Sequence, residues 1–150
     1  MNILKVLTDK RRKGNLGEDA AVRFLKKNGY KILERNFVGT SNEIDVIAKD
    51  KKRKTTVFVE VKARSISSIG SFESRPAAAV TPEKQRKIIS ASTVFMRKMR
   101  LETKMRYDII EVYLDKIDGK DTIKEIKHLI SAFDLNTAYD KSYFFNQKGQ

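Results

Sequence analysis

The chain has 150 residues, of which 40% are hydrophobic and 34% are charged, and it contains no cysteine. This length suits one domain with a sizeable core, and the lack of cysteine excludes a disulfide framework and a thiolate zinc site. The 32 Lys and Arg residues outnumber the 19 Asp and Glu residues, which gives a formal net charge of +13. Such an excess predicts affinity for a polyanion, most often nucleic acid. No apolar run reaches the ~20 residues that span a bilayer, so we expect a cytoplasmic protein without membrane contact.

The N-terminal half is predicted to hold one helix and three strands. Residues 1–14 are expected to form a basic surface arm. Apolar residues then recur at helical spacing over residues 16–28, and a glycine follows as a stop signal. Alternating apolar and polar residues predict strands over residues 30–38, 43–48 and 55–64. Because the last two strands flank a short basic turn, we expect them to pair as an antiparallel hairpin.

The C-terminal half begins with a long connection. Residues 65–80 include glycine, proline and five serines, and a loop of that length in a compact domain tends to be a functional lid or binding loop. Thr81-Pro82 predicts a helix start, with threonine as N-cap and proline in the first turn. Two further strands are predicted over residues 106–114 and 123–133, and residues 134–150 form a tail. The order α-β-β-β-α-β-β predicts a single domain with a mixed β-sheet flanked by helices.

Two of the predicted strands carry charged residues on one face. Side chains two residues apart share a face of a strand, so Glu43 lies with Asp45, and Glu60 lies with Lys62. We expect the other face of this hairpin to be the apolar core, and Asp45 and Glu60 to be cross-strand neighbours if the register aligns them. Two carboxylates held that close repel each other unless a cation lies between them.

A hard divalent ion suits such a pair of carboxylates. Mg²⁺ takes one or two carboxylates, keeps several waters and completes its octahedron with phosphate oxygens, and it can then activate water for attack on phosphorus. Lys62 can orient that water and stabilise charge on the phosphorane. The alternative is a solvated strand face on which Glu60 and Lys62 only pair with their neighbours. Their position in a strongly apolar run, 57–62, favours the functional interpretation, because burying unpaired charge is costly.

Several other polar residues also have predicted roles. Glu18 falls in the first turn of its predicted helix, where the helix dipole favours an acidic residue. Asp108 is predicted to be a buried partner for Arg106 or a lysine, and His128, the only histidine, to be a packed imidazole. The helix after Thr81 is rich in lysine and arginine, which is typical of either a solvated face or DNA-backbone contact.

Six segments follow one another in a recognisable order over about residues 14–133. They are GEDAA at 17–21, GYKILERN at 29–36, EIDVIA at 43–48, VFVEVKAR at 57–64, RYDII at 106–110 and HLISAF at 128–133. Together they resemble the YraN-like family of small bacterial proteins, which is similar to archaeal Holliday junction resolvases and has the restriction-endonuclease-like α/β fold. The resemblance implies that Asp45 and Glu60 hold Mg²⁺ or Mn²⁺, that Lys62 is the catalytic lysine, and that Glu18 belongs to the site. Ile44 stands where a literal Pro-Asp motif would have proline, as is usual in the YraN-like pattern.

The leading hypothesis is therefore a metal-dependent endonuclease of the PD-(D/E)xK type that hydrolyses DNA phosphodiester bonds at branched or single-stranded structures. Arg64, Lys84 and Lys87 are its expected contacts to nucleic acid, and a homodimer is expected by analogy with resolvases. The alternative is a nucleic-acid-binding protein that keeps the nuclease fold without catalysis. A structural or assembly protein is a third hypothesis, which fits the strongly positive net charge poorly.

Overall fold

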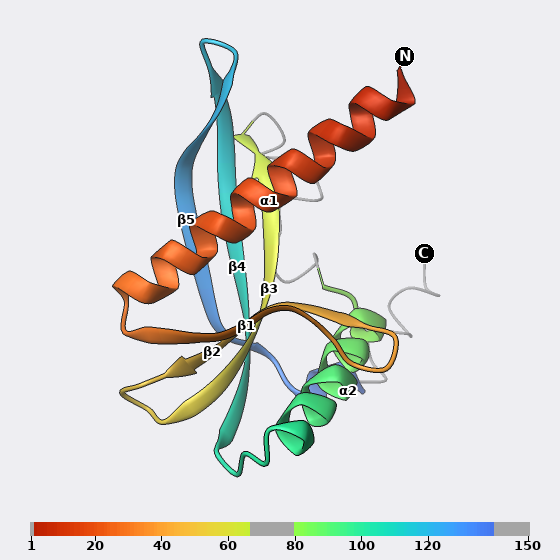
Figure 1. Ribbon diagram of the computed structural model, residues 1–150, viewed down its shortest axis with the longest axis vertical. Coiled ribbons are helices and arrows are strands. Elements are labelled where there is room, and N and C mark those ends of the chain that lie inside the picture. The colour runs from red at the N-terminus through yellow and green to blue at the C-terminus, as the bar shows by residue number, and fades with distance from the viewer. Residues whose placement is uncertain (1, 67–79, 140–150) are drawn as a thin grey trace.

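A computed structural model describes residues 2–66 and 80–139 of the chain. Its centre is a five-stranded mixed sheet with helices against both faces (Figure 1). In chain order, the elements are α1 (Ile3–Lys27), β1 (Tyr30–Val38), β2 (Glu43–Asp50), β3 (Thr55–Ser65), α2 (Pro82–Lys98), β4 (Lys104–Ile117), β5 (Lys120–Phe133) and the short α3 (Leu135–Ala138). The predicted α/β class and element order are confirmed, and α3 adds one turn of helix to the predicted tail.

The strands lie side by side in chain order, β1-β2-β3-β4-β5. Neighbouring strands are antiparallel except β3 and β4, which are parallel. That exception follows from α2, which lies between β3 and β4 in the chain, because parallel neighbours need a crossover connection. The predicted β2–β3 hairpin is confirmed. In Figure 1 the β1–β2 pair crosses the long β3–β4–β5 strands steeply, so that β2 stays beside β3 over only part of its length.

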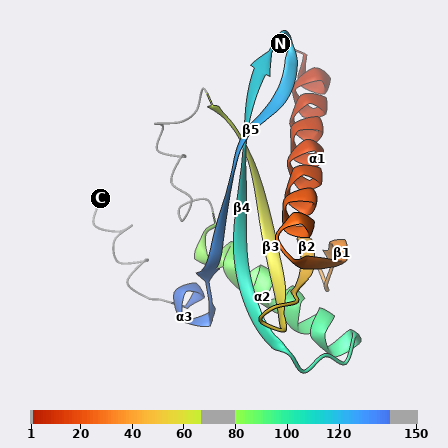
Figure 2. The same ribbon diagram turned by 90° about the vertical axis from the view of Figure 1, so that its left-hand side faces the viewer.

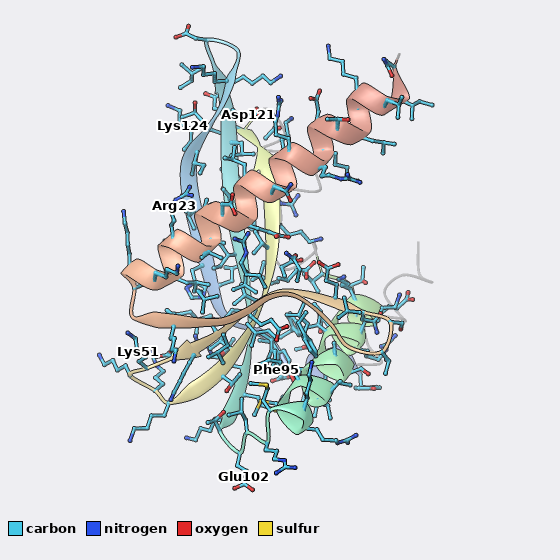
Figure 3. All side chains as sticks on the ribbon, in the orientation of Figure 1. Arg23, Lys51, Phe95, Glu102, Asp121 and Lys124 are labelled. Carbon is cyan, nitrogen blue, oxygen red and sulfur yellow. The ribbon has the colours of Figure 1, made fainter. Side chains whose placement is uncertain are left out.

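The edge-on view shows α1 on one side of the sheet and α2 on the other (Figure 2). The core on the α1 side includes Leu25, Val46 and Val59. The core on the α2 side includes Phe58 and, from the helix, Phe95, which lies between α2 and the sheet (Figure 3). The prediction that the hairpin has only one apolar face is therefore wrong, since Phe58, on the face predicted to be polar, is fully buried under α2.

Helix α1 is much longer than predicted. Asn2 caps it and accepts hydrogen bonds from the Leu4 and Lys5 backbone N–H groups, so the helix begins at Ile3 and not near residue 16. The predicted basic arm is thus the first half of this helix. That half extends past the sheet (Figure 1), and Ile3 and Leu4 are exposed. The apolar pattern begins at residue 16 because from there the helix packs on the hydrophobic core; Arg12 and Lys13 before it make polar contacts with β5 and β3.

Two glycines allow close contacts that position the candidate site. A Cβ at Gly17 in α1 would stand 3.0 Å from the Ala63 Cβ in β3, so the helix backbone lies directly on the sheet. A Cβ at Gly39, in the turn between β1 and β2, would stand 2.9 Å from the Ala91 Cα in α2. The first contact places the next residue, Glu18, near β3, and the second ties the start of β2 to α2.

The predicted start of α2 is confirmed, because Thr81 is the N-cap and Pro82 opens the helix. Met96 in the last turn of the helix is buried, whereas Met99, which follows its end, is exposed. Residues 67–79 of the predicted binding loop and residues 140–150 of the predicted tail lie outside the described residues. Within the described part of the chain, no helix is both long and apolar enough to cross a membrane.

Candidate active site

The candidate site lies where β2 and β3 separate. Their ladder runs from Asp50 opposite Thr55 to Val46 opposite Val59, and one further step of this register places Asp45 opposite Glu60. The regular pairing ends there, and the Asp45 carboxylate instead accepts a hydrogen bond from the Val61 backbone N–H at 2.8 Å. The side chain of Asp45 therefore replaces the missing rung of the ladder and is fixed against β3.

The usual alternation of side chains is also interrupted at this point. Val46 and Ala48 belong to the core on the α1 side, and Ile47 belongs to the core on the α2 side, as alternation requires. Ile44, however, joins Ile47 on the α2 side, whereas alternation predicts that it shares a face with Val46. This change in β2 accompanies its departure from β3, and it opens the end of the hairpin at Asp45.

Glu60 and Lys62 lie on β3 beside Asp45. Glu60 is buried, with 5% of its surface exposed, and the Lys62 Nζ lies 3.5 Å from the Glu60 Oε1. The Lys62 side chain is about one-third exposed at 34%, so its ammonium group connects a buried carboxylate with solvent. The structure thus brings together the three residues that strand alternation and the family resemblance single out.

The two carboxyl groups have raised pKa values. Burial raises the pKa of Glu60 to about 7, and the neighbouring Asp45 carboxylate also raises it, while Lys84 and Lys62 oppose the rise. Burial likewise raises the pKa of Asp45 against the lowering effect of the Val61 N–H and of Lys84. Two acidic groups thus share a poorly solvated space in which full ionisation is unfavourable. An added cation would relieve both effects.

Lys84 approaches the site from α2, the helix on the other side of the sheet from α1. It lies in the first turn of α2, and its positive charge acts on both Asp45 and Glu60. Lys87, one turn further along, instead forms an ion pair with Glu83 at 3.5 Å, and its side chain is 50% exposed. Of the two lysines predicted to contact nucleic acid from this helix, the structure places Lys84 at the site and leaves Lys87 on the outer surface.

Glu18 approaches Asp45 from α1. Burial, followed by the charge of Asp45, raises the pKa of Glu18, and Arg35 opposes the rise. The Arg35 Nη2 lies 3.7 Å from the Glu18 Oε2. With its amide nitrogen turned toward the carboxylates, Asn36 donates to Glu18 at 3.2 Å and to Glu43 at 2.9 Å. Glu18 is therefore held at the edge of the site, and Glu43 joins it through Asn36.

The position of Glu18 also excludes one of its two predicted roles. Because α1 begins at Ile3, Glu18 lies in the middle of the helix and far from its N-terminal dipole. The first-turn explanation is wrong, since it required a helix that starts near residue 16. Asn36 was not predicted as a member of this group. Its backbone φ of 51° is unusual for a residue other than glycine, but this conformation is visible only in the structure.

Asp108 and His128 belong to a separate, structural network on the α1 side of the sheet. Arg106 donates to both oxygens of Asp108 at 2.9 Å, to Asp50 at 2.9 Å and to the Tyr30 hydroxyl at 2.7 Å. The His128 Nε2 lies 2.8 Å from the Asp108 Oδ2. Burial acts to raise the pKa of Asp108, but hydrogen bonds from His128 and Arg106 lower it overall. The predicted pairing of Asp108 with Arg106 and the packed imidazole are confirmed.

Comparison with known proteins identifies the family. Residues 17–112 match the model of a family described as "Uncharacterised protein family UPF0102". The chain belongs to this family. A UPF0102 protein of Pelobacter propionicus is 39% identical over 128 residues, which cover 85% of this chain and 86% of the relative. One of Chlorobium phaeobacteroides is 42% identical over 80% of this chain and 92% of its own length, and one of Acetivibrio thermocellus is 41% identical over 83% and 93%.

Membership of UPF0102 confirms the YraN-like resemblance drawn from the six segments. We call the place where β2 and β3 separate the fork. The region that matches the family model includes the residues that meet there: Glu18, Asp45, Glu60, Lys62 and Lys84. The names of these relatives state no activity, so the geometry of the site carries the chemistry.

The structure also reveals charged residues that sequence reasoning missed. Glu111 on β4 lies directly across from Lys62 on β3 and is fully buried. The Tyr113 hydroxyl donates to the Glu111 Oε2 at 2.5 Å, and the Arg64 Nε lies 3.4 Å from the same oxygen. Arg64, expected to contact nucleic acid, is thus largely buried, with 14% of its side chain exposed. A glutamate between apolar residues in a strand was the one available signal for this group.

Proposed function

We propose that this UPF0102 protein is a divalent-metal-dependent endonuclease that hydrolyses phosphodiester bonds of DNA. Asp45 and Glu60 are the proposed metal ligands, and Lys62 is the proposed catalytic lysine. The observation that carries the proposal is the pair of buried carboxyls at the end of the β2–β3 ladder, with raised pKa values and two lysines beside them.

The residues at the fork fit Mg²⁺ or Mn²⁺. Both proposed ligands offer carboxylate oxygens, which hard cations prefer. Among the described residues there is no group of three or more His, Cys, Asp or Glu side chains placed to hold a metal. A site with two carboxylates suits Mg²⁺, which usually keeps several waters and binds substrate phosphate oxygens. When bound, the ion would supply Lewis acidity and lower the pKa of a bound water.

The chain's own groups have separate proposed roles around that site. Asp45 is fixed by the Val61 N–H and is hydrogen-bonded to Glu60, so the two proposed ligands are held side by side. Lys62, held 3.5 Å from Glu60 and partly exposed, orients the attacking water and stabilises negative charge that develops on the phosphoryl group. Lys84 adds a second positive charge from α2. Glu18, at the edge of the site, is proposed as a further acidic group that supports the ligands.

DNA is the proposed substrate, in branched or single-stranded form. The formal net charge of +13 favours binding to a phosphate backbone, and the similarity of the YraN-like family to junction resolvases supports branched structures. A fold-level likeness is a weaker argument than the site itself, so the substrate structure has to be tested directly. A homodimer, which would present two sites to a four-way junction, belongs to the same proposal.

The decisive experiment is a cleavage panel of single-stranded, duplex, flap and four-way DNA with Mg²⁺, Mn²⁺ or EDTA. We expect cleavage of at least one substrate with metal, none with EDTA, and a loss of roughly 100-fold or more in Asp45→Ala and Lys62→Ala. Lys51→Ala is the charge-matched control for Lys62, because Lys51 lies in the exposed turn after β2, away from the fork (Figure 3), and it should cut normally.

Two outcomes would reject this function. Cleavage that survives both Asp45→Ala and Lys62→Ala would mean that the fork is not the active site. Salt-dependent DNA binding without cleavage under either metal would favour the alternative, a nucleic-acid-binding protein that keeps the nuclease fold.

A further inference from the structure

A second charged group lies on the same face of the sheet as Asp45 and Glu60. It consists of Arg64 on β3 and of Glu111 and Tyr113 on β4. In the parallel register, Lys62 is opposite Glu111, and Arg64 is opposite Tyr113. Side chains at alternate positions share a face, so Glu60, Lys62 and Arg64 follow one another along β3 on the α2 side. The group therefore directly continues the candidate active site along the strand.

The contacts within this group are incomplete. The Tyr113 hydroxyl donates to the Glu111 Oε2 at 2.5 Å. The Arg64 Nε lies 3.4 Å from the same oxygen, in a geometry that makes an ion pair but no hydrogen bond. The Arg64 Nε and the Glu111 Oε1 are both buried without a hydrogen-bond partner. Buried polar atoms without partners are rare and costly in native proteins, so this arrangement is a poor device for stability alone.

The outer end of the Arg64 guanidinium is in a different situation. Among the described residues no hydrogen bond uses its Nη1 or Nη2, and neither nitrogen is among the buried atoms that lack a partner. The guanidinium is thus held on its Nε side by a buried carboxylate, while 14% of the side chain remains exposed. Such a fixed guanidinium fork matches the geometry of a phosphate group.

Tyr113 keeps Glu111 in place. Burial, followed by its hydrogen bond to Glu111, raises the pKa of Tyr113 to about 12, so the phenol stays a hydrogen-bond donor at neutral pH. The Lys127 Nζ lies over the Tyr113 ring at 5.2 Å from its centroid. Glu111 is therefore surrounded by residues that fix its carboxylate and aim it at Arg64.

We propose that Arg64 binds a nucleic-acid phosphate next to the one at the metal ligands, and that Glu111 and Tyr113 are positioning residues that orient its guanidinium. The choice of nucleic acid as the ligand rests on the proposed function. Arg64 stands two residues beyond Lys62, about 7 Å along the strand, so a chain that places one phosphate at Lys62 can extend its neighbour toward Arg64.

The test is binding of a tetrathymidylate in EDTA, followed by the ¹⁵N NMR signals of the arginine side chains. Saturable shifts of the Arg64 Nε–H signal are expected in the wild type. Arg64→Ala should weaken binding about tenfold, the equivalent of one charged hydrogen bond, and should lower the salt dependence by about one phosphate contact. Arg23→Ala is the matched control, because it removes the same charge from exposed α1, on the opposite side of the sheet (Figure 3), and should change binding less than about twofold.

Glu111→Gln separates positioning from simple charge. The substitution makes the protein more positive, so electrostatics alone predicts tighter binding to an anion. Positioning predicts the reverse: binding weakened about fivefold or more and a displaced Arg64 signal. Tyr113→Phe removes the hydroxyl donor without a charge change and should weaken binding in the same direction. It serves as the deciding variant if Glu111→Gln fails to fold.

Each part of the proposal has an outcome that would overturn it. Unchanged or tighter binding in Glu111→Gln and Tyr113→Phe would overturn the positioning role, and an Arg64→Ala protein that behaves like Arg23→Ala would overturn the phosphate site. Absence of any Arg64 shift in the wild type would also overturn it, even if the protein cuts DNA. Because the assay contains no metal, a protein that shows these effects but never cuts would refute the nuclease function and leave the phosphate site in place.

Discussion

Replacing Glu60 by glutamine is expected to stabilise the metal-free protein at pH 8. The Glu60 carboxyl has an ordinary pKa of 4.5 and a pKa of about 7 in the folded chain, because it is buried beside Asp45. A carboxyl with a raised folded-state pKa favours folding in its protonated form. Its stabilising contribution is present below pH 4.5 and is lost as the pH rises through about 7. At pH 8 the ionised wild-type side chain therefore destabilises the fold, and the neutral amide of Glu60→Gln does not.

The magnitude follows from the two pKa values. Their difference, at about 1.4 kcal/mol for each pH unit, corresponds to roughly 3 kcal/mol. The lost ion pair with the partly exposed Lys62 offsets little of this, since such pairs contribute about 0–1 kcal/mol. For a chain of this size, about 3 kcal/mol raises the melting temperature by about 6–12 °C. Because Asp45 and other groups titrate in both proteins, the difference between wild type and Glu60→Gln isolates this carboxyl.

The assay is thermal unfolding followed by circular dichroism in EDTA at pH 5 and pH 8, repeated with Mg²⁺ or Mn²⁺. Glu60→Gln should melt above the wild type at pH 8, and the gap should shrink at pH 5. Added metal should stabilise the wild type by mass action, by about 2.7 kcal/mol at 100 times its Kd, and should leave Glu60→Gln nearly unchanged. A Glu60→Gln protein that melts below the wild type at pH 8 in EDTA would show that burial and repulsion do not dominate at this carboxyl.

Three further substitutions test how the fold positions the site. Gly39→Ala should destabilise by about 1–3 kcal/mol, because its Cβ would stand 2.9 Å from the Ala91 Cα; Gly14→Ala, with nothing within 4 Å, is the control and should stabilise α1 by about 0.5–1 kcal/mol. Asp108→Asn should cost about 3–5 kcal/mol, since it leaves a buried guanidinium short of charge. Thr81→Ala should cost about 1 kcal/mol by removing the N-cap of α2. Urea unfolding measures all four, and a Gly39→Ala protein as stable as Gly14→Ala would contradict the close contact.

Local sequence patterns predicted most of the fold. The bounds of β1 agree with the predicted residues 30–38, and the β2–β3 hairpin and the Thr81 cap are also confirmed. These features depend on residues near one another in the chain. The proximity of Asp45 and Glu60 was predictable for the same reason, because a hairpin with a short turn has few possible registers.

Features that depend on distant contacts were not predictable from one sequence. The first half of α1 lacks an apolar pattern against the sheet and is a helix all the same. The burial of Glu111 follows from the parallel pairing of β3 with β4, which are joined through α2 and the residues before it. The approach of Lys84 to Asp45 likewise requires α2 to cross the sheet at a particular place. Each of these depends on tertiary packing, which overrides local propensity.

The two faces of the sheet treat buried charge in opposite ways. On the α1 side, Arg106 satisfies Asp108 and Asp50 with hydrogen bonds at 2.9 Å, and the network is closed. On the α2 side, the Glu60 carboxyl has a raised pKa, and the Glu111 Oε1 is buried without a hydrogen-bond partner. Both groups include residues of β4, so the fold itself does not force the second to be incomplete. Departures from complete polar pairing concentrate where function requires them, and here they mark the face on which a cation and a phosphate would supply the missing partners.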